Sequence, residues 1–106
     1  MTIMNDRLLR DLLLGFIKIH ILYHTGKTRV FGQEFRHELQ RHGYHVSYGT
    51  LYPIFHKLEA QGYLKSTREN INGRIRRYYT LTRSGRTILG KAKRQAKELV
   101  EELYED

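Results

Sequence analysis

The stretch SYGTLYPIFHKLEAQGYLKSTRENINGRIRRYYTLT, residues 47–82, decides the fold. Its first third predicts a helix that begins at Ser47, because a serine side chain accepts a hydrogen bond from the first free backbone N–H groups. The helix is expected to end at Gly62, since glycine adopts the left-handed conformation that closes many helices. Apolar residues recur at helical spacing and form its buried face, namely Leu51, Ile54, Phe55 and Leu58.

The rest of this stretch predicts a β-hairpin. Tyr63–Glu69 and Arg74–Leu81 have the composition of strands, and Asn72-Gly73 between them is typical of a tight turn in which both residues have positive φ. Ile75, Tyr79 and Leu81 have the spacing of one strand face.

Helices are also predicted on both sides of this stretch. The first runs from Asp6 to Tyr23 and ends near Gly26, and a very short strand follows at residues 28–30. A second helix covers residues 31–41. The last covers residues 84–104 and is capped by Thr82 or Ser84.

A hairpin directly behind a helix that follows two others is the order of a winged helix-turn-helix. We therefore expect a mainly α fold with a small β-hairpin. Residues 1–82 are expected to form a winged helix-turn-helix DNA-binding domain, and residues 83–106 a C-terminal dimerisation helix that continues from it as one compact unit.

Composition narrows the functional classes. The chain has 106 residues and no cysteine, which excludes disulfides, thiolate zinc sites and a cysteine nucleophile. The longest apolar run, residues 12–17, is too short to span a bilayer, and no secretory signal is seen, so a cytoplasmic location is expected. No phosphate-binding glycine loop, nucleophile elbow or carboxylate cluster is found, so we expect neither an enzyme nor a required cofactor.

The distribution of charge along the chain indicates what kind of partner it binds. The chain has 19 Lys and Arg against 11 Asp and Glu, a net charge of +8. Between Lys65 and Arg86, seven basic residues stand against Glu69 alone, so this segment carries +6 of that charge. A basic two-stranded arm suits phosphate contact or insertion into a minor groove of double-stranded DNA, whereas the alternative is an arm that is basic only for solubility.

Two groups of residues are therefore predicted to bind DNA. The exposed start of the third helix brings hydrogen-bonding groups and aromatic rings, although burial of either tyrosine against its neighbours is an alternative. This recognition helix contributes Ser47, Tyr48, Gly49, Thr50, Tyr52, Pro53, His56 and Lys57. The wing contributes Lys65, Arg68, Asn72, Gly73, Arg74, Arg76 and Arg77.

The final helix predicts a homodimer. Its apolar residues are spaced alternately three and four apart, as in a coiled-coil seam, although a helix packed on the core would show the same pattern. Its basic residues lie in the first half and its acidic residues in the second, which opposes the helix dipole and indicates an outside partner, either DNA or the second subunit. The seam consists of Leu89, Ala92, Ala96, Leu99 and Leu103.

Two other functions are alternatives to DNA binding. Six histidines are many for this length, and His20 and His24, four residues apart on one helix, are weak candidates for a metal sensor, with structural or surface histidines as the alternative. Peripheral binding to an anionic lipid surface is less favoured, because the apolar face of the last helix lacks Trp and Phe. No membrane partner is expected.

Short motifs stand at Leu13-Gly15-Phe16, residues 48–53, Leu58-Glu59, residues 62–64 and residues 76–82. They resemble those of the PadR family of bacterial transcription regulators, over roughly residues 8–103. The resemblance implies a winged helix that represses transcription from a palindromic operator. It also implies a dimer made by the C-terminal helix with help from the first helix, here Leu9 and Phe16. A single helix after the wing is similar to the short branch of the family.

Multidrug-sensing members of that family sandwich flat drugs with a tryptophan of the last helix. This chain has no tryptophan, so that role is not expected, although Phe16 or Tyr104 is available to line a groove. A small molecule or a metal ion remains an option for the effector.

Overall fold

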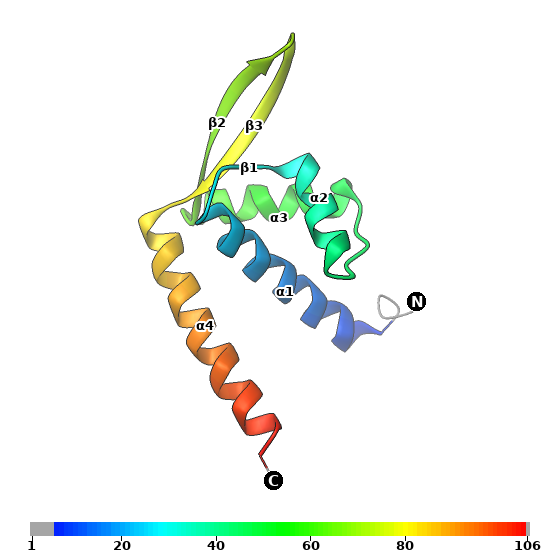
Figure 1. Cartoon of the computed structure of the whole chain (residues 1–106), viewed down its shortest axis with the longest axis vertical. Coiled ribbons are helices and arrows are strands. Elements are labelled where there is room, and N and C mark those ends of the chain that lie inside the picture. Colours follow the sequence, from blue (N-terminus) through cyan, green and yellow to red (C-terminus); the bar gives the residue numbers. More distant parts are fainter. Residues whose placement is uncertain (1–5, 106) are drawn as a thin grey trace.

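Residues 6–105 are described by a computed structural model, and they form four helices and three strands (Figure 1). The order is three helices, a hairpin and a last helix, with one short strand between the first two helices, as the sequence predicts. The elements are α1 (Arg7–Thr25), β1 (Val30–Phe31), α2 (Gly32–Arg41), α3 (Tyr48–Ala60), β2 (Leu64–Ile71), β3 (Arg74–Leu81) and α4 (Arg83–Leu103).

Side-chain caps fix where three of the helices begin. The carboxylate of Asp6 accepts from the backbone N–H of Leu9, the hydroxyl of Ser47 from Thr50, and the hydroxyl of Thr82 from Gly85. Thr82 rather than Ser84 is therefore the cap of α4. The short strand lies two residues later than expected, at Val30–Phe31, because pairing with β3 begins at Val30.

The core lies between the first three helices and the base of the sheet. Ile17 and Ile21 of α1, Leu39 of α2 and Leu51 and Phe55 of α3 are almost completely buried. Tyr79 of β3 is buried as well, and its ring lies 4.7 Å from the ring of Phe55. This ring contact seats the base of the hairpin on the recognition helix.

The sheet has the order β1-β3-β2, and the hairpin pairs without a bulge from Leu64↔Leu81 to Ile71↔Arg74. Asn72 and Gly73 have φ values of 53° and 85°, as the predicted turn requires. The outer half of the hairpin projects beyond the helices (Figure 1). Ile75 shares a strand face with Tyr79 but is 63% exposed, because β3 has left the body of the molecule at that point.

The start of α4 is held against the turn between α3 and β2. The hydroxyls of Thr82 and Ser84 both donate to the carbonyl of Gly62, at 2.6 and 2.8 Å. Gly85 is buried so tightly that a methyl group there would overlap the carbonyl oxygen of Tyr63. Beyond this junction α4 runs away from the hairpin to the opposite end of the molecule (Figure 1).

Within residues 6–105, no helix combines the length and the apolar character needed to cross a lipid bilayer.

Two glycine substitutions in α4 should have opposite effects on stability. Gly85→Ala forces a methyl group into the Tyr63 backbone and should lower the free energy of unfolding by about 1–3 kcal/mol. Gly90→Ala meets only the end of the Arg94 side chain, and should raise it by up to about 1 kcal/mol through helix propensity. Urea denaturation measures both, and a neutral Gly85→Ala would show that the junction is not tightly packed.

Candidate nucleic-acid interface

One face of α3 is available to a partner. Leu51, Phe55 and Leu58 turn into the core, which leaves the opposite side of the helix exposed. The predicted recognition residues on that side divide into two groups, one next to α1 and one next to the hairpin.

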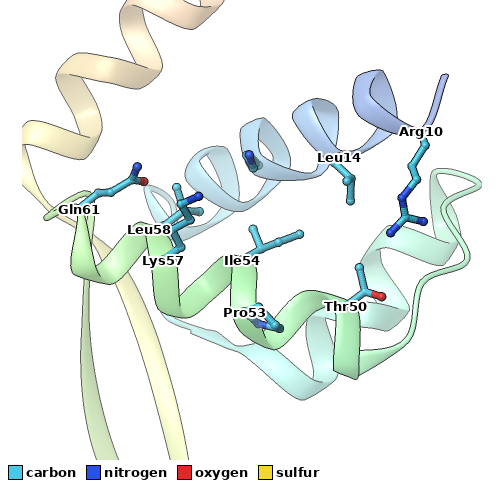
Figure 2. A pocket seen from close by; sticks show the side chains of 9 residues that line it. Arg10, Leu14, Thr50, Pro53, Ile54, Lys57, Leu58 and Gln61 are labelled. Carbon is cyan, nitrogen blue, oxygen red and sulfur yellow. The ribbon is translucent and has the colours of Figure 1, made fainter. Parts of the chain in front are cut away.

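The group next to α1 lines a shallow groove between α1 and α3. Thr50, Pro53 and Lys57 of α3 face Arg10 and Leu14 of α1 across it (Figure 2). Arg10 and Lys57 place positive charge on the α1 side and on the α3 side of this groove. The helix is continuous through Pro53.

The group next to the hairpin is aromatic. Tyr52 is 43% exposed, and its ring stacks on the exposed His56 at 5.8 Å between ring centres. Tyr48 is half-buried against Gly32 of α2, and burial raises the pKa of its phenol. Of the two tyrosines, Tyr52 is therefore the more exposed, while the ring of Tyr48 also packs against α2.

The exposed N-terminus of α3 is the third feature of this face. Ser47 and Gly49 are both exposed, and no side chain covers the first turn at Gly49 except the capping hydroxyl of Ser47. The partial positive charge of a helix N-terminus attracts phosphate.

The basic residues of the wing lie on two opposite faces of the hairpin, because neighbouring residues in a strand point to opposite sides. Arg68 and Arg77 are paired across the strands on the face that packs toward α3. Lys65, Arg74 and Arg76 lie on the other face. Arg74 and Arg76 share a face, as predicted, but that face does not continue the surface of α3.

Aromatic rings and acidic groups engage three arginines near the hairpin. The guanidinium of Arg76 lies 4.8 Å from the ring centre of Phe31, and that of Arg29 lies 3.9 Å from the ring centre of Tyr78. Arg29 also forms an ion pair with Glu69. On the α3 face, Arg77 lies 4.0 Å from Glu59. These contacts hold Arg29, Arg76 and Arg77 near the base, whereas Arg68 and Arg74 are exposed and have no ion pair among residues 6–105.

Sequence reasoning missed Arg29 and Glu59 because both act through tertiary contacts. Glu59 accepts a 2.6 Å hydrogen bond from Ser66 in addition to its contact with Arg77, and so ties α3 to both strands of the hairpin. No local pattern around either residue predicts these partners.

The predicted seam of α4 is largely uncovered in the single chain. Leu99 and Leu103 are 50% and 67% exposed, and Ala96 is exposed as well. Leu89 and Ala92, nearer the junction, are half-buried. Other residues of the same chain therefore bury only the beginning of the predicted seam.

Two residues of α1 that were expected to assist the dimer, Leu9 and Phe16, are also exposed, at 38% and 44%. Phe16 and Tyr23 line an apolar groove together with Leu89 and Ala96 of α4. Tyr104 is 83% exposed at the far end of the helix and does not line this groove.

The candidate metal residues His20 and His24 lie on the face of α1 that meets the end of α2. The structure adds His42, and the ligand atoms of all three histidines lie within 4.8 Å of one another. Burial lowers the pKa of His20 and of His24, which favours the neutral imidazole. The sequence did not single out His42, although Glu38 and His42 repeat the four-residue spacing of His20 and His24.

Comparisons with known proteins agree with this geometry. The sequence model of the PadR-like family of transcriptional regulators matches residues 21–91. The chain is 42% identical over 95 residues to a transcriptional regulator of Mycobacterium tuberculosis, covering 90% of this chain and 89% of that protein.

Solved structures are similar over most of the chain. A PadR family transcriptional regulator from Eggerthella lenta superposes with a TM-score of 0.81 at 27% identity, covering 91% of this chain and 85% of the other. A PadR-like transcriptional regulator from Bacillus cereus gives a TM-score of 0.76 at 25% identity, covering 91% and 99%. These relatives are regulators of transcription and not enzymes.

Proposed function

This chain belongs to the PadR-like family of transcriptional regulators and binds double-stranded DNA, and we propose that it is a homodimeric repressor of a palindromic operator. The observation that carries the proposal is that the exposed side of α3 and the hairpin meet at one junction, while the uncovered apolar seam of α4 leads away from it. A protein of this shape bound across a promoter excludes polymerase from the same DNA, so repression follows from occupancy.

The exposed side of α3 supplies base recognition in this proposal. Tyr52 and His56 offer a hydroxyl and a ring nitrogen to base edges in the major groove. Ser47 and the N-terminus of α3 bind a backbone phosphate, and Lys57 and Arg10 neutralise others along the groove between α1 and α3. Phosphate contacts set the position, and the aromatic pair reads the sequence.

The wing supplies much of the affinity. The face that continues α3 carries Arg68 and Arg77, and Arg74 extends from the turn. Because Arg77 is shared with Glu59, we assign the main phosphate contact of the α3-side face to Arg68, and a further contact at the tip of the hairpin to Arg74.

The partner subunit covers the seam of α4. Leucines this exposed on an ordered helix favour burial by a second copy, which gains about 1.5–3 kcal/mol for each fully buried leucine. Exposed apolar residues on α1, including Leu8, Leu12 and Phe16, extend the uncovered surface. Under two-fold symmetry, antiparallel α4 helices would also set the acidic end of each beside the basic half of the other.

A charge-matched pair of variants tests the wing. Arg68→Ala should lower the slope of log affinity against log salt by about 1, because one phosphate contact is lost. Lys65→Ala removes the same charge from the opposite face of the same strand and should change the slope less. Fluorescence anisotropy over a range of salt concentrations measures both. Equal slopes for the two variants would contradict the assignment of the α3-side face to DNA.

Adjacent exposed residues of α3 test the division between reading and positioning. His56→Ala should cost about 1–3 kcal/mol of discrimination between the operator and a duplex changed at one contacted base pair. Lys57→Ala should instead weaken both duplexes to the same extent, because a phosphate contact carries no sequence information. Competition binding with the two duplexes measures the ratio, and an unchanged ratio in His56→Ala removes that residue from base recognition.

Variants on two faces of α4 test the dimer. Leu99→Ala combined with Leu103→Ala should raise the dimer dissociation constant by at least about 100-fold, since each copy loses two buried leucines. Arg94→Ala combined with Glu98→Ala lies on the opposite face, leaves the net charge unchanged and should have little effect. Analytical ultracentrifugation distinguishes them. A monomeric wild-type chain at micromolar concentration would refute the homodimer.

A further inference from the structure

Two pairs of potential metal ligands face each other across the contact between α1 and the end of α2. Each pair has the four-residue spacing that places two side chains on one side of a helix. His20 and His24 form the pair on α1, and Glu38 and His42 form the pair at the end of α2. Neither helix alone offers more than two ligands, so the cluster exists only in the folded chain.

The three imidazoles are close to the geometry that a metal ion needs. The rings of His20 and His42 lie 4.7 Å apart between centres, and those of His20 and His24 lie 6.2 Å apart and nearly parallel. Their ligand atoms lie within 4.8 Å of one another. Nitrogens bound to one tetrahedral zinc ion stand about 3.3 Å apart, so small side-chain rotations bring all three to one ion.

Glu38 lies beside two of the three imidazoles and is a hydrogen-bond partner of His42. Its Oε2 atom lies 3.1 Å from Nε2 of His42 and 3.6 Å from Nε2 of His24. Its other oxygen accepts from Arg41 at 2.9 Å. A carboxylate that accepts from a metal-binding imidazole fixes the orientation of the ring and offsets the charge of the cation, so Glu38 acts as a positioning residue.

The surroundings are apolar on the inner side and open on the outer side. The ring of Phe35 packs edge-on against His24 at 5.5 Å, and Tyr44 packs against His20 at 5.4 Å. The side chains of His24 and His42 are 25% and 42% exposed. An ion can therefore reach the imidazoles from solvent, whereas the inner wall keeps them in place.

We propose that His20, His24 and His42 bind one divalent transition-metal ion of the zinc class, oriented by Glu38, and that this ion is an effector of the regulator. Neutral imidazoles without thiolates suit Zn²⁺ or its chemical neighbours rather than Mg²⁺ or Ca²⁺, which prefer oxygen ligands. Three protein ligands would leave the fourth position of a tetrahedral ion open to water.

The effector role rests on the proposed function, and the position of the site explains how it would act. The ion ties α1, whose Phe16 and Tyr23 lie on the uncovered apolar surface, to the end of α2. The chain passes from α2 through residues 42–47 directly into the cap of α3. Metal binding would thus fix the dimer surface relative to the recognition helix, and allosteric coupling of this kind typically changes affinity about 5- to 150-fold.

Zinc binding to the full-length protein, without DNA, tests the site directly. Competition with a chromophoric chelator should give one Zn²⁺ per chain, and Zn²⁺ should raise the melting temperature because it binds the folded state. Co²⁺ should give the visible absorption of a tetrahedral site. His42→Ala, at the exposed end of α2, should abolish all three effects, whereas His37→Ala, an exposed histidine on the same helix, should abolish none.

Glu38→Gln separates positioning from ligation. It should weaken Zn²⁺ binding about 10- to 100-fold while leaving the shape of the Co²⁺ spectrum unchanged. Equal zinc affinity in the wild type and His42→Ala, with circular dichroism showing both folded, overturns the site. Operator affinity that is measurable and is the same with Zn²⁺ and with a chelator overturns the effector role, whereas no operator binding in either condition contradicts the proposed function and leaves the zinc measurements as the test of the site.

Discussion

The relative placement of α3, the hairpin and α4 depends on two hydrogen bonds to the carbonyl of Gly62. Thr82 and Ser84 both donate to this single acceptor, and Thr82 at the same time caps α4. The last turn of α3, the first residue of β2, the end of β3 and the start of α4 all meet there. The backbones of Gly85 and Tyr63 approach so closely that no side chain fits at Gly85. This close contact keeps the recognition helix, the wing and α4 in fixed relative directions.

Strand register decides which charges of the wing serve the same surface as α3. Pairing of Arg68 with Arg77 and of Glu69 with Arg76 divides a basic segment into two chemically different faces. One face shares its base with Glu59 and the aromatic core, and the other is covered in part by Phe31 and Arg29. A count of arginines therefore overstates the charge that any one ligand can meet.

Local signals in the sequence were sufficient for the elements, and tertiary contacts explain what they missed. Ser47, Thr82 and Asn72-Gly73 act within a few residues, so helix starts and the turn could be predicted. Ile75 fits the inward pattern of β3 but is exposed, because alternation does not reveal where a strand leaves the core. His42 lies 22 residues from His20 in sequence, and only the packing of α2 on α1 brings their rings together.

The residues that are predicted to bind DNA divide in the same way. Tyr48 and Tyr52 have equal standing in the sequence, yet only the structure shows that Gly32 gives Tyr48 a place to pack. The pairing of Arg77 with Glu59 likewise depends on how the hairpin lies on α3. Such preferences are set by the neighbours of a side chain in space, which a single sequence does not display.

The uncovered length of α4 would link the concentration of the protein to its activity if the helix assembles as proposed. Beyond the junction much of the apolar face of this helix is uncovered by its own chain, and helices in proteins are stabilised mainly by packing of such a face. Its order would then be supplied by a second molecule, so that folding of the helix and assembly become one concentration-dependent event. In a cell, the share of such a protein in its assembled form would therefore rise with the rate of its synthesis.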